Sequence, residues 1–238
     1  MSASTISFSA GPAMLPREVI AALSEALIYW PEAGRSLVGI SHRHPQFILV
    51  MDEIEALIRD LLNVPEGYEV IWAPGGASAQ FSLMPLNLLA SDEIGAYQLT
   101  GYWGELAYRE AAKLRTVEAW NPERQDHYRY LHTVLNETIA GKLISLPENH
   151  LPVIADATSY LMSLPVAVER FGAVYASCQK NMGIPGLALV IIRRDLLQDR
   201  NLPALFFYSR LASEKSLVNT PPVVTLLSIL YMLRWILS

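Results

Sequence analysis

Short apolar runs alternate with helical segments along most of this chain, and this alternation constrains its fold more than any other feature. Segments 15–30 and 46–62 carry apolar residues at helical spacing. Strand-like apolar runs, some of them separated by further helical segments, lie at 68–73, 94–99, 128–135, 153–155, 173–176 and 187–192. Such alternation predicts an α/β fold with a mostly parallel sheet and helices on both of its faces.

Composition narrows the classes of partner. The 238 residues are 52% hydrophobic and 17% charged, with a formal net charge of -5 and no run of lysine and arginine. We therefore expect no nucleic-acid partner and no anionic membrane surface. The apolar run 223–237 is shorter than the roughly 20 residues that cross a bilayer, and it contains Arg234, so it predicts a packed helix.

The cysteine content and the first residues indicate the compartment. Cys178 is the single cysteine, so the chain forms no internal disulfide. The opening residues lack a basic segment followed by a long apolar one, which a secretory leader would show. We expect a cytoplasmic protein.

Two polar residues follow successive strand-like runs. Asp156 comes directly after the run that ends at 155, and Lys180 follows the run 173–176. In parallel sheets, ligands bind beyond the carboxyl ends of the strands, so both side chains are placed to face one crevice. Asp156 is either the partner of a cation, such as a protonated pyridine nitrogen, or a helix cap. Lys180 is either an amine that forms a Schiff base or a surface lysine.

Further candidates lie at the starts of predicted helices. Gly75 to Ser78 join a strand to a helix, where free backbone N–H groups favour an anion; the segment is either a phosphate cradle or a simple tight turn. Trp103 follows another strand and could stack on a planar cofactor or pack in the core. Arg43 could bind a carboxylate while His42 and His44 bind a phosphate, or the segment could be a helix cap with solvated charges. The histidines lack the spacing of a metal site, so we predict no metal.

Read in order, these segments resemble the phosphoserine aminotransferases, a family of class V, fold type I enzymes that depend on pyridoxal 5'-phosphate. The resemblance covers nearly the whole chain, and its strings keep the family's order. The matching strings are FSAGPAMLP (8–16), SHR (41–43), GGASAQF (75–81), GYW (101–103), NETI (136–139), DATS (156–159), QKN (179–181) and NTPP (219–222).

The resemblance implies a role for each matching position in the cofactor site. Lys180 would carry the cofactor as a Schiff base and shuttle a proton, and Asp156 would face the ring nitrogen. Trp103 would stack on the ring, and Thr138 would bond near its phenolic oxygen. The remaining cofactor contacts implied, all to the phosphate, come from Ala77, Ser78 and Gln179, with Asn219 and Thr220 reaching across from a neighbouring subunit.

The resemblance also implies a substrate and an assembly. Arg43, together with His42, would bind the substrate, with Arg43 on the carboxylate of the amino acid. The expected reaction passes the amino group of L-glutamate to 3-phosphooxypyruvate, giving O-phospho-L-serine and 2-oxoglutarate. It belongs to serine biosynthesis, with pyridoxine biosynthesis as a second pathway. The expected assembly is a homodimer with the site at its interface.

The chain departs from the family pattern in three places. The segment between Trp103 and Asn136 is shorter than usual, and Ser78 stands where some members have arginine. We expect an arm at 1–15, a cofactor-binding domain at 16–220, and at 221–238 a helix leading to a small C-terminal domain that is largely absent. The apolar helix at 221–238 would then have no domain to cover it.

The alternative function is an inactive or weakly active cofactor-binding remnant that works only with a partner subunit. A third function, that of a cysteine desulfurase using Cys178, fits poorly.

Overall fold

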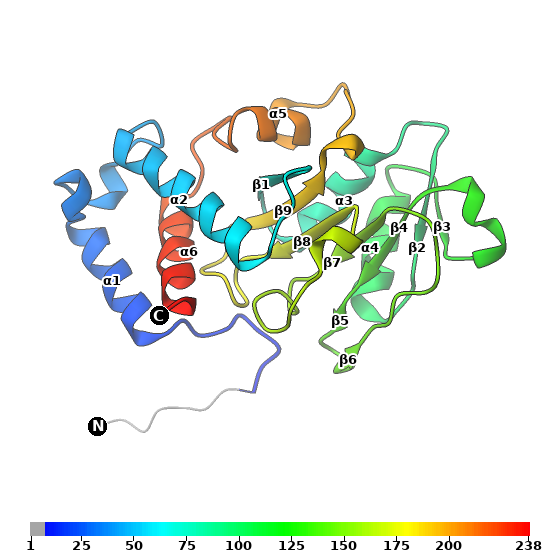
Figure 1. Ribbon diagram of the computed structural model, residues 1–238, viewed down its shortest axis with the longest axis horizontal. Helices are drawn as coiled ribbons and strands as arrows, with labels where there is room; N and C mark the ends of the chain where they lie inside the picture. Colours follow the sequence, from blue (N-terminus) through cyan, green and yellow to red (C-terminus); the bar gives the residue numbers. More distant parts are fainter. Residues whose placement is uncertain (1–7) are drawn as a thin grey trace.

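A computed structural model describes residues 8–238 of the protein (Figure 1). The α-helices are α1 (Arg17–Ile28), α2 (Pro45–Leu61), α3 (Ala77–Leu88), α4 (Tyr102–Ala112), α5 (Tyr208–Ser213) and α6 (Val223–Ile236). The strands are β1 (Tyr68–Pro74), β2 (Ile94–Tyr97), β3 (Val117–Ala119), β4 (Tyr128–Val134), β5 (Asn136–Glu137), β6 (Lys142–Leu143), β7 (Val153–Asp156), β8 (Ala173–Ser177) and β9 (Leu187–Arg193). Within the described residues, no helix is both long and apolar enough to span a bilayer.

The main sheet has the strand order β1-β9-β8-β7-β4-β2-β3. The pairs among β3, β2, β4, β7 and β8 are parallel, whereas β9 runs antiparallel to both of its neighbours, β8 and β1. The predicted α/β class with a mostly parallel sheet is confirmed. The reversed direction of β9 was not predicted, because a buried apolar run has the same pattern in either direction.

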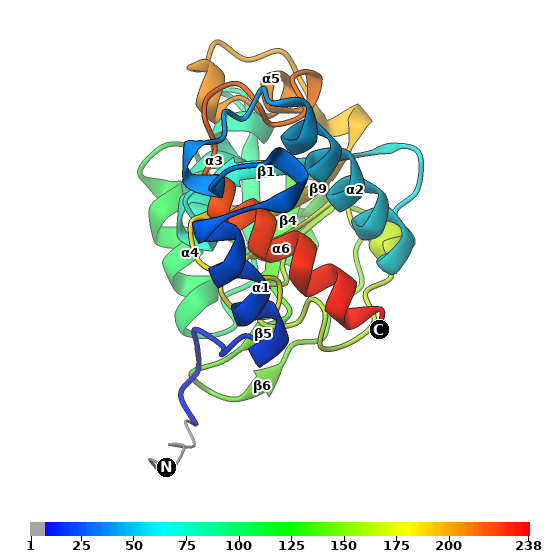
Figure 2. The same ribbon diagram turned by 90° about the vertical axis from the view of Figure 1, so that its left-hand side faces the viewer.

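Helices cover both faces of this sheet, and alternate residues along each strand separate the two cores. Helices α3, α4 and α5 pack on the face that carries Ile154, Tyr175 and Val190. Helices α2 and α6 pack on the opposite face, which carries Ala155 and Val174, and α1 lies against α6 (Figures 1 and 2). The high apolar content of the sequence therefore fills two core layers, one on each face of the sheet.

The expectation that the apolar helix at 223–237 would be uncovered is wrong. Helix α6 packs between α1 and α2, and Leu226, Leu227, Ile229 and Leu233 are fully buried. Figure 2 shows α6 running beside α1. Two amphipathic helices early in the chain thus supply the cover that we had expected only from a further domain.

Helix boundaries follow local chemistry. Helix α2 begins at Pro45, whose missing N–H costs nothing in a first turn, and His44 Nδ1 accepts a hydrogen bond from the N–H of Gln46 (3.3 Å). Helix α3 begins after Gly75, whose φ of +85° suits glycine. A side chain at Gly75 would also meet Ala79 Cβ at 2.7 Å. The turn between β1 and α3 therefore requires glycine on two separate grounds.

Candidate active site

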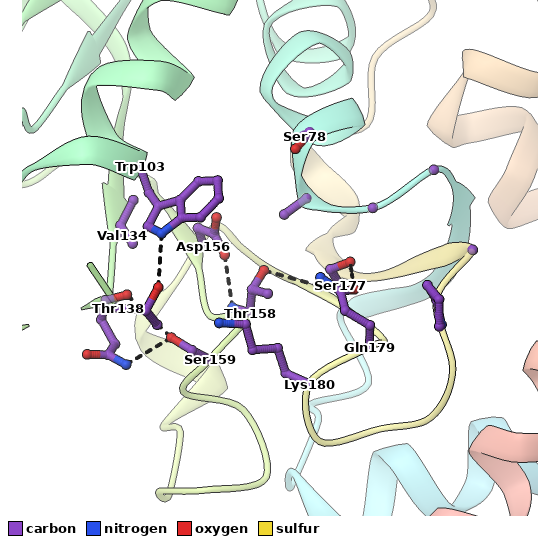
Figure 3. A pocket seen from close by; sticks show the side chains of 16 residues that line it. Ser78, Trp103, Val134, Thr138, Asp156, Thr158, Ser159, Ser177, Gln179 and Lys180 are labelled. Carbon is purple, nitrogen blue, oxygen red and sulfur yellow. Dashed lines mark hydrogen bonds between the residues drawn. The ribbon is translucent and has the colours of Figure 1, made fainter. Parts of the chain in front are cut away.

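A cavity of about 360 Å³ opens at the carboxyl ends of β7 and β8, beside the first turns of α3 and α4 (Figure 3). Its volume lies within the usual range for small-molecule sites. Gly75 and Gly76 line it, together with seven residues to which the sequence assigned a cofactor contact: Ala77, Ser78, Trp103, Thr138, Asp156, Gln179 and Lys180. The sheet places them together because β7 and β8 are parallel neighbours, so their carboxyl ends share one edge.

Asp156 is the buried acid of the cavity. Its side chain is 5% exposed, and its Oδ1 accepts a hydrogen bond from the N–H of Thr158 (2.9 Å). Burial raises the pKa of Asp156 from 3.8 to about 6, although the hydrogen bonds from Thr158 act in the opposite direction. A carboxylate held in this way is favourable only beside a cation, so the cavity is suited to a positively charged ring atom.

Lys180 lies on the loop that follows β8 and points toward the same space (Figure 3). Burial lowers the pKa of its amine, while the negative charge of Asp156 acts to raise it. A lower pKa increases the fraction of neutral amine, which is the nucleophilic form. The Nζ atom donates a hydrogen bond to the carbonyl oxygen of Ala10 (2.6 Å).

Trp103 forms a wall of the cavity from the first turn of α4. Its Nε1 donates a hydrogen bond to Thr138 Oγ1 (3.0 Å), which fixes the plane of the indole (Figure 3). Its own backbone N–H donates to Glu137 Oε2 (3.1 Å). A ring fixed at both ends can stack on a flat ligand with little further loss of freedom.

The start of α3 offers an anion site at another wall. The first N–H groups of a helix lack partners within the helix, and here those of Ala77 and Ser78 lie at the cavity. Gly76 must be small, because an added Cβ would come within 2.6 Å of Ser177 Oγ. Ser177 Oγ in turn donates a short hydrogen bond to Gln179 Oε1, so the last residue of β8 holds the Gln179 side chain at the cavity.

The other residues predicted from the sequence lie outside this cavity. Arg43, Asn219 and Thr220 are exposed, and His42 is partly buried with no hydrogen-bond partner for its Nε2. None of the four lines the cavity, so a single chain does not bring them to Lys180. Their predicted contacts with the phosphate and the substrate stay predictions.

Three contacts of the site were missed at the sequence level. The segment 10–13 crosses the loop after β8, where Ala13 N–H donates to the carbonyl of Gln179 (3.0 Å) in addition to the bond between Lys180 and Ala10. Thr158 lies between Asp156 and Ser177. Its N–H donates to Asp156 Oδ1, and its Oγ1 accepts a hydrogen bond from the N–H of Ser177 (3.2 Å). Glu137 binds the start of α4. The threonine and glutamate stand in the quoted strings, but nothing local to them reveals a partner distant in sequence.

Cys178 is fully buried, and burial raises its pKa to about 12, so it does not provide an accessible thiolate nucleophile. No three histidine, cysteine, aspartate or glutamate residues in the described part of the chain, 8–238, are grouped so as to hold a metal ion.

The donor set fits one class of ligand well. The cavity joins a buried carboxylate, a nucleophilic amine, a fixed indole and a helix start whose N–H groups attract an anion. A planar, cationic, carbonyl-bearing ring with an anionic arm would satisfy all four.

The sequence matches known proteins across most of its length. The family described as aminotransferase class-V matches residues 6–222. Phosphoserine aminotransferase from an Exiguobacterium species is 37% identical over 98% of this chain and 68% of its own length. The protein of the same name from Lactococcus lactis subsp. cremoris is 37% identical over 96% of this chain and 70% of its own length.

Solved structures agree with the sequence matches. Phosphoserine aminotransferase from Bacillus circulans subsp. alkalophilus superposes with a TM-score of 0.89 at 33% identity, over 96% of this chain and 69% of that one. The pyridoxal-phosphate-bound enzyme from Trichomonas vaginalis gives a TM-score of 0.87 at 30% identity, over 96% of this chain and 70% of that one. With fold, cavity and sequence in agreement, the chain belongs to the class V aminotransferase family.

Proposed function

We propose that this chain is a pyridoxal-phosphate-dependent phosphoserine aminotransferase. It would pass the amino group of L-glutamate to 3-phosphooxypyruvate, giving O-phospho-L-serine and 2-oxoglutarate in serine biosynthesis. The observation that carries the proposal is that Lys180, Asp156 and Trp103 line one cavity, in a chain whose relatives bear that enzyme's name.

Asp156 and Lys180 would have separate chemical roles in the cavity. Pyridoxal phosphate, when bound, supplies an electron-withdrawing ring that stabilises negative charge on the substrate's α carbon. Asp156 would keep a proton on the ring nitrogen, because its buried carboxylate gains most from a positive neighbour. Lys180 would hold the cofactor covalently through Nζ, and its free amine would accept the α proton of the substrate.

The walls of the cavity orient the cofactor. Trp103 would stack on the ring, and Thr138 would lie near its phenolic oxygen. The N–H groups of Ala77 and Ser78, with Gln179, would hold the phosphate at the start of α3.

The four assigned residues outside the cavity would act from a second copy of the chain. We place Arg43 and His42 on the substrate, and Asn219 and Thr220 on the cofactor phosphate, each contributed by the neighbouring subunit of a homodimer. The exposure of Arg43, Asn219 and Thr220, and the position of all four residues outside the cavity of their own chain, support this arrangement. The proposal locates the enzyme in the cytoplasm.

Single-turnover kinetics test the function. The chain is loaded with pyridoxal phosphate, freed of excess, and mixed with L-glutamate while the cofactor's absorbance is followed; 3-phosphooxypyruvate should then reverse the change. Stoichiometric 2-oxoglutarate and phosphoserine are the expected products. Cofactor binding without either half-reaction would point instead to the inactive remnant, and absence of binding would overturn the whole proposal.

A further inference from the structure

Glu137 is a buried carboxylate outside the proposed catalytic set. It is 0% exposed, and in the structure of residues 8–238 it forms no ion pair within salt-bridge distance. Leaving a carboxylate in such a place is costly unless several donors face it. The donors that do face it all belong to the segment where α4 begins.

Those donors are shared unequally between the two oxygens of Glu137. Oε1 accepts hydrogen bonds from Thr100 Oγ1 (2.8 Å) and from the N–H of Gly104 (2.9 Å). Oε2 accepts from the N–H of Trp103 (3.1 Å). The carboxylate thus replaces the missing partners of a helix start and lies at the positive end of the helix dipole.

Two glycines let the carboxylate and the helix meet. At Gly101, φ is +154°, and an added Cβ would lie 3.1 Å from Glu137 Cδ. At Gly104, an added Cβ would meet Thr100 Oγ1 at 2.6 Å and the backbone oxygen of Gln98 at 2.9 Å. The spacing of these glycines on either side of Trp103 therefore reflects the space that Glu137 and its donors occupy.

Glu137 and the next residue, Thr138, hold opposite ends of Trp103. Glu137 fixes the backbone N–H, and Thr138 Oγ1 accepts from the indole Nε1 (3.0 Å). Because β5 carries Glu137 and leads directly to Thr138, a single short segment sets both the position and the plane of the cavity wall.

We propose that Glu137 is a positioning residue, which acts through Trp103 to fix the face on which a flat aromatic cofactor stacks. The inference rests on the proposed function, since it assigns the stacking ligand to pyridoxal phosphate. Glu137 itself does not line the cavity. It acts on the cavity wall through the helix start, and its negative charge separately raises the pKa of Asp156.

Glu137→Gln is the direct test. The amide can keep an oxygen toward Thr100 and Gly104, but it then turns an NH₂ toward the N–H of Trp103, so two donors face each other. The dissociation constant for pyridoxal phosphate should rise by about tenfold, the size expected when one bond to a charged group is lost. The visible circular dichroism of the bound cofactor, per mole bound, should shrink because the ring is less firmly oriented.

A matched control is Glu93→Gln. Glu93 Oε2 also accepts a backbone N–H, that of Ala90 (2.7 Å), but it lies outside the cavity lining. This variant should leave both the affinity and the dichroism of the cofactor unchanged. In a Trp103→Ala background no ring is left to position, so adding Glu137→Gln should raise the dissociation constant by less than it does in the wild type.

Several outcomes would overturn the proposal. Equal affinity and equal dichroism in Glu137→Gln and wild type would do so, as would an undiminished rise in the dissociation constant in the Trp103→Ala background. If Glu137→Gln does not fold, Thr100→Val removes one support of the carboxylate and should weaken binding by about threefold; wild-type values in that variant would refute the role. A wild-type chain that fails to bind pyridoxal phosphate would instead refute the proposed function.

Discussion

The cofactor half and the substrate half of the proposed site are built in different ways. Asp156, Trp103 and Lys180 lie on the edge of the sheet or just beyond it, and their partners are named residues of the same chain. Arg43, Asn219 and Thr220 are exposed and lie outside the cavity. This difference predicts that one chain supplies the contacts to the cofactor ring, whereas the second contact to the cofactor phosphate and the recognition of the substrate come from a neighbouring copy.

The largest effect should come from the cofactor half. Lys180→Ala removes both the covalent anchor and the proton carrier, so transamination should fall by about 10⁴-fold, the upper end for acid–base catalysis. Folding should be little changed, because the side chain is only partly buried.

Borohydride reduction of the loaded wild type, followed by peptide mapping, identifies the labelled lysine among the four in the chain. Lys113→Ala is the control, since that lysine pairs only with Glu110 on the surface. A label that persists in Lys180→Ala at Lys113, Lys142 or Lys215 would refute the assignment.

Asp156→Asn should lower the transamination activity but raise the stability of the cofactor-free protein. Activity should fall by about 100-fold, because the ring nitrogen loses the charge that keeps it protonated. Without cofactor, the variant should be the more stable protein at neutral pH. The folded pKa of Asp156 is raised to about 6, so the folded state binds more protons than the unfolded state between pH 4 and 6, and stability falls as pH rises through this window.

Thermal unfolding at pH 4 and pH 8 measures this directly. The advantage of Asp156→Asn should be small at pH 4 and reach up to about 3 kcal/mol at pH 8. Asp195→Asn is a control of opposite sign, because its hydrogen bond with Arg193 lowers the pKa of Asp195. An advantage for Asp156→Asn that does not grow with pH would contradict the raised pKa.

The cofactor half was also the more predictable half. Asp156 and Lys180 were recognisable because each follows an apolar run, and parallel strands bring such positions to one edge. The role of Glu137 was not, because it depends on contacts with Thr100 and Gly104 across more than thirty residues of sequence. Likewise, the burial of α6 required knowing that α1 and α2 fold back on it. Periodicity specifies elements, and topology decides which elements meet.

Arg43→Ala tests the substrate half. If Arg43 binds the substrate carboxylate, its loss should raise the KM for glutamate by about tenfold to 100-fold, as for other bonds between charged groups. Cofactor affinity and the borohydride label at Lys180 should not change, because Arg43 lies outside the cavity.

Mixed subunits then test whether this half comes from a second chain. When Arg43→Ala and Lys180→Ala chains are refolded together, a mixed dimer contains one site with both residues intact. Activity should exceed that of either variant alone. No recovery, despite mixed dimers detected by tagged copies, would indicate that Arg43 serves its own chain or has no role.

Thr138→Val should have the smallest effect of the substitutions in the cofactor half. It replaces the acceptor of the Trp103 Nε1 bond by a methyl group of similar volume, so the indole keeps its backbone anchor at Glu137 but loses control of its plane. A neutral hydrogen bond is worth about 1 kcal/mol, so the cofactor's dissociation constant should rise by only about threefold to fivefold.

Thr133→Val, which removes a bond to Gln98 away from the cavity, is the matched control and should have no such effect. Titration of both variants with pyridoxal phosphate, followed by absorbance, gives the comparison. A loss at Thr138 as large as that at Glu137 would mean that the bond to the indole, together with the contact of Thr138 with the cofactor, matters as much as the helix start held by Glu137.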